Sequence, residues 1–309
     1  MYGNGGLFDD FKNAWSRPNN GLIQLIMINI IVFVVLIILK VVFSISGLSE
    51  LYNGILNNVM LPSSIDRFIT QPWSLITYFF SHGTAIGSYS QGFMHIIMNM
   101  LFLYWFGKVL VEYLGDQRAI SLYVIGGIVG GLFYVLFYNL IPFYHDRVDH
   151  SLLIGASGGV FAIVVGAATF MPNYTFFLLF IGPVKIKWIA LIYVFISFTG
   201  IAGANAGGEL AHLGGALMGF IFIRQLQRGN DIGTPVVSVM EWFKGLFKPS
   251  PKIRVTHKST KFTGTKKASS SNTKSDQDEI DAILDKISHS GYESLSKEEK
   301  QKLFNASKK

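Results

Sequence analysis

Six long runs of apolar residues constrain this chain more than any other feature of its sequence. A helix needs roughly 20 mostly apolar residues to cross the hydrocarbon core of a bilayer. Runs of about that length, repeated along one chain, are typical of proteins that cross a membrane several times. The expected spans are residues 22–43, 93–111, 119–141, 152–170, 188–204 and 207–223.

The composition indicates the same environment. Charged residues make up 15% of the chain, whereas a soluble domain carries about 25%. There is no cysteine, which excludes disulfides, thiolate nucleophiles and cysteine metal ligands, and we expect no metal and no cofactor. The net charge of +7 could indicate a nucleic-acid partner, but the basic excess lies in one set of loops and in the C-terminal tail. We therefore expect a lipid bilayer as partner and no nucleic acid.

The basic residues also predict the orientation, because Lys and Arg accumulate in cytoplasmic loops. One set of loops carries most of them: Lys12, Arg17, Lys108, Arg118, Lys185, Lys187, Arg224 and Arg228. We therefore expect a multi-pass protein of the cell (inner) membrane with both termini in the cytoplasm. The first run, 22–43, is too long for the apolar region of a cleavable signal peptide.

Four regions are expected: an N-terminal cytosolic or interfacial segment at 1–20, a six-span region at 21–228, a segment at 229–275, and a small cytosolic hairpin at 276–309. Within the span region, the connection 44–92 is too long for a plain loop, so we expect it to fold against the membrane. The segment 234–248 is predicted to form an amphipathic helix, either interfacial or short and frayed. Its apolar face would hold Val236, Val239, Met240, Phe243 and Phe247.

The tail is predicted to hold two short helices after a linker. Residues 249–275 are rich in Lys, Ser and Thr, a composition typical of disorder. Apolar residues spaced as on one helical face then predict a helix over 278–288. Ser296 and Glu299 have the spacing of a capping box that begins a second helix, ending near Phe304. Such a hairpin is too small for a catalytic core, and a cytosolic partner for 278–304 is expected.

Polar residues near the ends of three spans are candidates for function, because polar groups inside a bilayer are costly. They are His95 and Asn99 in the second span, Ser157 in the fourth and His212 in the sixth. These spans all run from the outside inward, so topology alone brings the residues to a similar depth near the external face. Each alone has a structural interpretation, such as helix packing for a serine. We assign only interface or packing roles to His82, His145, His150 and Asn29.

The residues around the candidate serine and histidine are small. Gly155 and Gly158 flank Ser157, which allows a tight turn and close approach of a substrate. The N-terminus of a helix there would offer N–H groups to a developing oxyanion. Gly215 and Gly219 follow His212, and such a GxxxG face lets helices approach closely. If the neighbour is the fourth span, His212 can accept the proton of Ser157 as a general base.

The segments HIIMN (95–99), GASGG (155–159) and AHLGGALMG (211–219) together resemble the rhomboid intramembrane proteases, over about residues 71–227. The resemblance implies an all-α membrane protein with a six-transmembrane-helix rhomboid-like bundle, here followed by the small cytosolic hairpin. It implies a serine endopeptidase that cleaves single-span membrane proteins near the external end of their transmembrane segment.

The resemblance also implies roles for individual residues. Ser157 is the nucleophile and His212 the base of a Ser–His dyad without a third acid, and we expect no carboxylate within the spans to orient His212. The oxyanion hole combines the backbone N–H groups of Ser157 and Ala156 with the side chains of His95 and Asn99. Phe161, one turn after the serine, is expected to pack on the histidine.

Two departures from the family pattern concern the external connection. Ser74 follows Trp73 where the family has Arg, and the stretch between His82 and His95 is longer. Other intramembrane proteases are excluded, because the HExxH motif of zinc enzymes is absent, the candidate Asp residues fall in loops, and no Lys lies near Ser157. A transporter would carry charges along a pathway. The main alternative is a catalytically silent, rhomboid-like protein that binds membrane clients.

Overall fold

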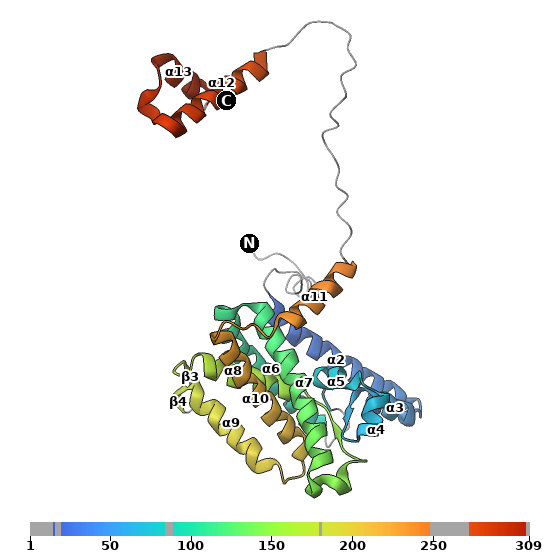
Figure 1. The fold of residues 1–309 in the computed structure, drawn as a ribbon. Helices are drawn as coiled ribbons and strands as arrows, with labels where there is room; N and C mark the ends of the chain where they lie inside the picture. The colour runs from blue at the N-terminus through green and yellow to red at the C-terminus, as the bar shows by residue number, and fades with distance from the viewer. Residues whose placement is uncertain (1–14, 16–19, 84–88, 179–180, 248–271, 307–309) are drawn as a thin grey trace. The chain divides into compact units, whose positions relative to one another are not determined.

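The structure, a computed structural model, describes residues 15, 20–83, 89–178, 181–247 and 272–306, and these are mostly helical. The chain divides into two compact units, Met1–Lys248 and Pro249–Lys309, which are coloured along the chain in Figure 1. The division falls inside the segment 229–275, which was expected to join the membrane region to the tail.

The first unit is a bundle with a helix at each of the six expected places. The helices are α2 (Gly21–Ile45), α6 (Tyr89–Leu114), α7 (Asp116–Leu140), α8 (Ser157–Phe170), α9 (Ile186–Gly200) and α10 (Ala206–Gln227). Among the described residues, α2, α6, α7 and α10 are long and apolar enough to cross a membrane, whereas α8 and α9 are shorter apolar helices. Four spans are therefore supported by length, and six remains a prediction.

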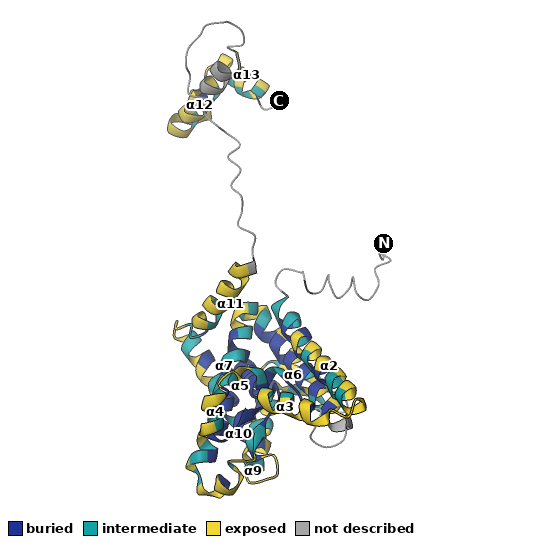
Figure 2. Cartoon of the chain, turned by 90° about the vertical axis from the view of Figure 1, so that its right-hand side faces the viewer, coloured by how far each residue is buried: buried dark blue, intermediate teal, exposed yellow. Residues whose placement is uncertain are grey.

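Helix α8 lies at the centre of this unit. It packs against α6, α7, α9 and α10, and most of its residues are buried. Figure 2 shows that the buried residues, in dark blue, lie inside the bundle. A helix enclosed by other helices has few lipid contacts, so its 14 residues need not match the bilayer thickness. The outward sides of α2 and α9 are instead exposed and apolar.

Glycines permit the close packing of α8 against its neighbours. A Cβ on Gly215 would overlap the carbonyl oxygen of Gly158, and one on Gly219 would overlap that of Ala162. The backbones of α10 and α8 therefore touch directly, as in membrane helix pairs with small residues at the interface. Helix α7 approaches the same residue of α8, because a Cβ on Gly126 would overlap the Cβ of Ala162.

The start of α8 differs from the expected span of 152–170. Leu152–Leu153 form strand β2, which pairs antiparallel with strand β1 (Leu61–Pro62), and Gly155 has a φ of +135°. Both features are incompatible with helix, so the helix begins only at Ser157. The candidate nucleophile is thus the first residue of the helix.

The connection between α2 and α6 packs on the bundle, and its expected place against the membrane remains a prediction. It contains α3 (Ser49–Val59), β1, α4 (Ile65–Thr70), α5 (Ser74–Thr77) and the short 3₁₀ helix η1 (Tyr78–Phe80). Tyr78 and Phe79 are fully buried. Gly127 and Gly131 of α7 leave room for them, since a Cβ at either position would lie within 3 Å of these rings.

The remaining elements of the first unit connect or flank the bundle. A 3₁₀ helix η2 (Pro142–Arg147) follows α7, and β3 (Thr175–Leu178) pairs with β4 (Gly182–Lys185) between α8 and α9. Asp116, at the start of α7, accepts hydrogen bonds from the N–H groups of Gly21 (2.9 Å) and Leu22 (3.3 Å) and so caps α2. This contact fixes one end of the first helix against the third.

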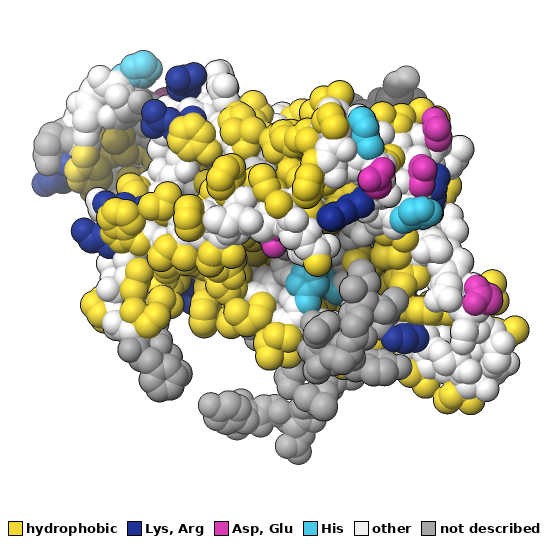
Figure 3. Space-filling model, turned by 90° about the horizontal axis from the view of Figure 1, so that it is seen from below, with side chains coloured by type: hydrophobic (Ala, Val, Ile, Leu, Met, Phe, Trp, Pro, Cys, Tyr) yellow, Lys and Arg dark blue, Asp and Glu magenta, His cyan; other side chains and the backbone are white. Residues whose placement is uncertain are grey.

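The amphipathic helix expected at 234–248 is present as α11 (Thr234–Phe247). Val239, Trp242, Phe243 and Leu246 are exposed on it, while the side chain of Phe247 lies outside the described residues. Broad apolar areas also cover the surface in Figure 3. Such areas are typical of proteins that contact lipid or other proteins.

The second unit contains α12 (Asn272–Ser290), the 3₁₀ helix η3 (Tyr292–Ser294) and α13 (Lys297–Ala306). The capping pair is present: the N–H of Ser296 donates to Glu299 Oε2 (2.7 Å) and the N–H of Glu299 to Ser296 Oγ (3.2 Å). Helix α12 begins at Asn272, inside the expected linker. The rest of that linker, and most of the segment 1–20, lie outside the described residues.

Candidate functional site

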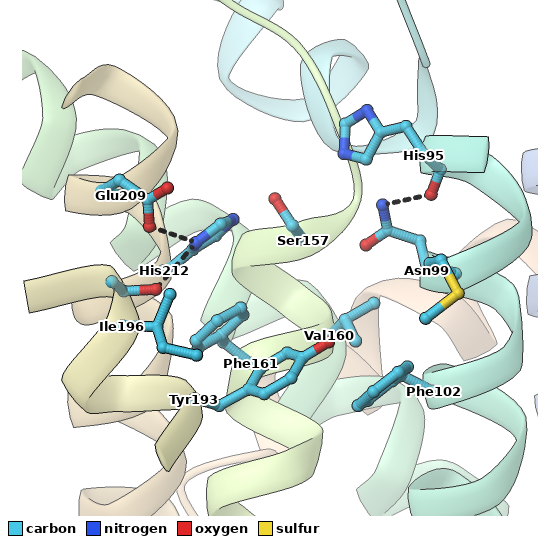
Figure 4. A pocket seen from close by; sticks show the side chains of 12 residues that line it. His95, Asn99, Phe102, Ser157, Val160, Phe161, Tyr193, Ile196, Glu209 and His212 are labelled. Carbon is cyan, nitrogen blue, oxygen red and sulfur yellow. Dashed lines mark hydrogen bonds and ion pairs between the residues drawn. The ribbon is translucent and has the colours of Figure 1, made fainter. Parts of the chain in front are cut away.

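A cavity of about 340 Å³ opens between α6, α8, α9 and α10. It contains all four polar side chains that the sequence singled out, and Figure 4 shows them facing one another across it. The cavity is lined by His95, Met98, Asn99, Phe102, Ser157, Val160, Phe161, Tyr193, Ile196, Ser197, Glu209 and His212. The candidate serine, the candidate histidine and possible hydrogen-bond donors therefore share one small, largely apolar space.

Ser157 lies where the chain turns from strand to helix. Gly155, two residues earlier, has a φ of +135°, a conformation that residues with side chains rarely adopt. Ala156 is buried, whereas Ser157 is half-buried and faces the cavity. Because the first N–H groups of a helix have no partner one turn earlier, the start of α8 can offer donors and a favourable dipole to a negative charge.

Three residues contact the ring of His212. Its ring stacks on Phe161, with the ring centroids 4.1 Å apart and the planes inclined by 5°, as the family resemblance implied. Its Nδ1 lies 3.1 Å from Ser197 Oγ and 3.1 Å from Glu209 Oε2. The other ring nitrogen points toward Ser157 in Figure 4. This orientation suits a base that takes a proton from the serine hydroxyl.

The expectation that no carboxylate lies within the spans is wrong. Glu209 belongs to α10 and lies inside the span expected at 207–223, one turn before His212. The two side chains are neighbours because residues three apart share a helical face. The spacing Glu-x-x-His in the sequence is therefore the signal that predicts this contact.

The opposite wall of the cavity comes from α6. Asn99 is buried, and its Nδ2 donates to the carbonyl oxygen of His95 at 2.9 Å. That bond uses one of the two amide hydrogens. A Cβ on Gly155 would lie 3.3 Å from His95 Nε2 and 3.8 Å from Ser157 Oγ, so the missing side chain of Gly155 lets the His95 ring approach the serine.

The structure corrects the interface role assigned to His82, whereas Asn29 keeps a packing role. His82 is fully buried, and its ring centroid lies 5.5 Å from that of His95, so it is not an interface residue. Burial, followed by the neighbouring His95, lowers the pKa of His82 to about 3, and the ring stays neutral. Asn29 has a polar partner, because the hydroxyl of Tyr123 donates to its Oδ1 at 3.3 Å. His145 and His150 are exposed.

Small residues bring the helix of His212 against the helix of Ser157 and against α7. Gly158 directly follows the serine, and the contact of Gly215 with its carbonyl brings α10 against the first turn of α8. Gly130 of α7 approaches the carbonyl of Ala211 in the same way. The depth of His212 relative to Ser157 is thus set by backbone contacts, which tolerate less adjustment than contacts between flexible side chains.

Comparison with known proteins agrees with these observations. A family model described as "Rhomboid domain" matches residues 70–228, just over half of the chain. A second, described as a family of unknown function (DUF6576), matches residues 269–309, which include α12 and α13.

Three relatives illustrate the similarity. RHOMBOID-like protein 12, mitochondrial, from Arabidopsis thaliana is 29% identical over 57% of this chain and 52% of its own. Rhomboid protein 1, mitochondrial, from Saccharomyces cerevisiae is 33% identical over 50% of this chain and 42% of its own. The rhomboid protein YdcA from Bacillus subtilis is 26% identical over 50% of this chain and 70% of its own. The chain spans about half the length of the first two relatives.

Proposed function

Because this chain belongs to the rhomboid family of membrane proteins, we propose that it is an intramembrane serine endopeptidase that uses Ser157 and His212. The observation that carries the proposal is the shared cavity. In it, Ser157 and a His212 ring fixed by Phe161 lie opposite the candidate oxyanion donors His95 and Asn99. Neither a packing serine nor an interface histidine requires this arrangement.

The proposed reaction begins with the attack of Ser157 Oγ on a peptide carbonyl carbon. As the new C–O bond forms, the serine proton moves to His212 Nε2. When the tetrahedral intermediate collapses, the same proton passes to the leaving amine, and an acyl-enzyme remains on Ser157. Water then attacks the acyl carbon with His212 again acting as base, which releases the second product and restores the hydroxyl.

The negative charge of the tetrahedral oxygen needs donors that are already in place. The backbone N–H groups of Ala156 and Ser157 and the side chains of His95 and Asn99 are the proposed donors. Such preorganised groups contribute strongly in a cavity with little water. The second amide hydrogen of Asn99 is available for this purpose, because only one is used in its bond to His95.

The proposed substrate is a single-span membrane protein, cleaved near the external end of its transmembrane segment. A peptide bond inside a regular helix has its carbonyl hydrogen-bonded and shielded, so the segment must unwind locally to reach Ser157. Small, helix-destabilising residues favour such unwinding. The cavity volume of about 340 Å³ accommodates a few residues of unwound chain rather than a whole helix.

We also propose six membrane spans, with α8 and α9 crossing despite their shorter length, and both termini in the cytoplasm of a cell (inner) membrane. The distribution of Lys and Arg supports this orientation. Reporter fusions after Lys187 and Arg228 should read cytoplasmic, whereas one at His145 should read external. A cytoplasmic reading at His145 would contradict the shared depth of the site residues.

The decisive experiment measures cleavage of a model membrane substrate by the purified protein and by Ser157→Ala and His212→Ala. Loss of a nucleophile or its base typically lowers turnover by more than about 10⁴-fold, so both variants should fall below detection with unfolding temperatures near that of the parent. Substantial cleavage by either variant would refute the assignment. A parent protein that binds membrane clients without any cleavage would favour the catalytically silent alternative.

A further inference from the structure

We infer that Glu209 is a positioning residue whose carboxylate holds His212 in the orientation and tautomer that lets its Nε2 act on Ser157. This inference rests on the proposed protease function and replaces the expected dyad with a three-residue arrangement of Ser157, His212 and Glu209. Glu209 Oε2 lies 3.1 Å from His212 Nδ1, and both side chains are largely buried, with 19% and 15% of their surfaces exposed. Both also line the cavity that holds Ser157.

The chemistry of the carboxylate selects one tautomer of the ring. A neutral imidazole carries a single N–H, and an ionised carboxylate can only accept hydrogen bonds. A contact at 3.1 Å between Nδ1 and Glu209 Oε2 therefore places the hydrogen on Nδ1 and leaves the lone pair on Nε2. That nitrogen points toward Ser157 in Figure 4, which is the arrangement a general base needs.

Ser197 cannot make this selection by itself. Its Oγ lies at the same distance from Nδ1, 3.1 Å, but a hydroxyl both donates and accepts and is compatible with either tautomer. Only the carboxylate excludes the tautomer whose hydrogen sits on Nε2. Ser197 instead completes the wall that α9 forms beside the ring.

Glu209 is itself fixed in place. It lies in the first turn of α10, where the helix dipole favours a negative charge. The end of α9 lies against its side chain: a Cβ on Gly200 would meet Glu209 Cγ at 2.8 Å and Cδ at 3.0 Å. The missing side chain of Gly200 thus provides the space in which Glu209 reaches His212.

In the proposed reaction, Glu209 neither gains nor loses a proton. As Ser157 Oγ bonds to the carbonyl carbon, the hydroxyl proton moves to His212 Nε2 and the ring becomes a cation. Glu209 stays ionised and stabilises that cation through the N–H on Nδ1, as a carboxylate does in a Ser-His-Asp triad. The negative charge of Glu209 therefore stabilises the His212 ring and does not contact the substrate.

The competing explanation is that Glu209 only stabilises the start of α10. The two explanations predict opposite orders for two substitutions. Glutamine has nearly the shape of glutamate, so a packing role makes Glu209→Gln mild and Glu209→Ala severe. For a positioning role, the glutamine amide can donate to Nδ1 and favour the wrong tautomer, whereas alanine leaves Ser197 to accept from it. Glu209→Gln is then at least as damaging as Glu209→Ala.

The test measures kcat and KM for a model membrane substrate, together with thermal unfolding, for the full-length protein in detergent. Glu209→Gln should lower kcat by about 10- to 100-fold, the size expected for one charge-assisted hydrogen bond, with KM within about twofold. Glu112→Gln, the same substitution at an exposed position near the end of α6, should match the parent. Ser157→Ala establishes that the measured cleavage belongs to this site.

A remote substitution tests the same inference without removing the charge. Gly200→Ala would displace the Glu209 side chain and should lower kcat in the parent, yet have little further effect in a Glu209→Ala background. Glu209→Gln with parental kcat, or Glu209→Ala slower than Glu209→Gln, would overturn the inference while leaving the Ser157 assignment intact. Absence of any Ser157-dependent cleavage in the parent would instead refute the proposed function itself.

Discussion

The two units of this chain are stabilised in opposite ways. In the first unit, backbones approach at glycines such as Gly215, and large aromatic residues such as Tyr78 fill the remaining space. In the second unit, Ile283 and Leu295 are the buried apolar residues among those described, and ion pairs at 2.7–2.9 Å join α12 to α13: Lys286–Glu299 and Lys302–Glu279.

The difference in how the two units are stabilised follows from the solvent expected around each unit. Lipid is as apolar as the side chains, so helices in a bilayer gain little by hiding them and associate through close packing instead. A short pair of helices in water gains from covering even a small apolar stripe, and exposed ion pairs add little because water screens them. The bundle should therefore be intolerant of added volume, and the tail tolerant of most single changes.

The strongest test of this comparison adds one methyl group to a helix contact. In Gly215→Ala the new Cβ overlaps the carbonyl of Gly158, and because this obstacle is backbone, α10 must move away from α8. We expect a loss of about 3 kcal/mol or more in stability and loss of cleavage, measured by thermal unfolding and activity in detergent.

The matched control is Gly54→Ala in α3, where nothing lies within 4 Å of the added atom. There, alanine should raise stability by up to about 1 kcal/mol, because it favours helix more than glycine does. The two substitutions should thus have opposite signs. If Gly215→Ala were as stable as Gly54→Ala, the direct contact of α10 with α8 would be wrong.

Substitution of a buried polar residue with a proposed catalytic role should affect stability less than Gly215→Ala does. Asn99→Ala should lower kcat by about 10²–10³-fold, as removal of one oxyanion donor does, with little change in unfolding temperature. Asn58→Ala is the matched control: Asn58 in α3 makes the same bond to the carbonyl four residues earlier, at 2.9 Å, but is exposed. Equal kcat values for the two variants would remove Asn99 from the proposed oxyanion hole.

The sequence was informative where periodicity and position decide the structure. Apolar runs located the six helices of the bundle, and the expectation that Ser157, His212 and His95 lie close together agrees with their place in one cavity. The sequence was less informative where contacts between distant segments determine the local structure. The extended approach to α8 depends on pairing between Leu153 and Leu61, and no local pattern in either segment predicts that pairing.

The histidine environment shows the same limit. The ring centroid of His82 lies 5.5 Å from that of His95, a contact between the segment after η1 and helix α6 that a linear pattern cannot reveal. Glu209 is a different case, since its position three residues before His212 was visible in the sequence. A charge close to a span end is commonly taken as an interface residue, and its partner becomes evident only when the ring orientation is known.

In the tail, a modest and pH-dependent effect is expected from Glu299. The N–H of Ser296, and then Lys286, lower the pKa of this carboxylate below its ordinary value of 4.5. A carboxylate whose pKa is lowered by folding stabilises the folded state above its unfolded pKa, and that stabilisation is lost as the pH falls through the folded pKa. Helicity of a peptide covering 269–309, followed by circular dichroism, should therefore decline below about pH 4.5.

Glu299→Gln should flatten this acid transition, because the titrating group is gone, while lowering helicity at pH 7. Glu298→Gln changes the adjacent exposed residue and should leave the transition in place. An unchanged acid transition in Glu299→Gln would mean that the capping pair observed with Ser296 does not govern the stability of α13.

The smallest expected effect comes from the largest change, removal of residues 249–309. Every residue that lines the cavity belongs to the first unit, and the second unit has its own buried residues and ion pairs, as an independently folding part does. Truncation after Lys248 should therefore leave kcat on a model substrate in detergent within about twofold of the full chain. In cells the same truncation should change partner choice or abundance, because Leu284 is exposed on α12 and we propose that a cytosolic partner covers it. A truncated protein that is well folded yet inactive would contradict the separation of the two units.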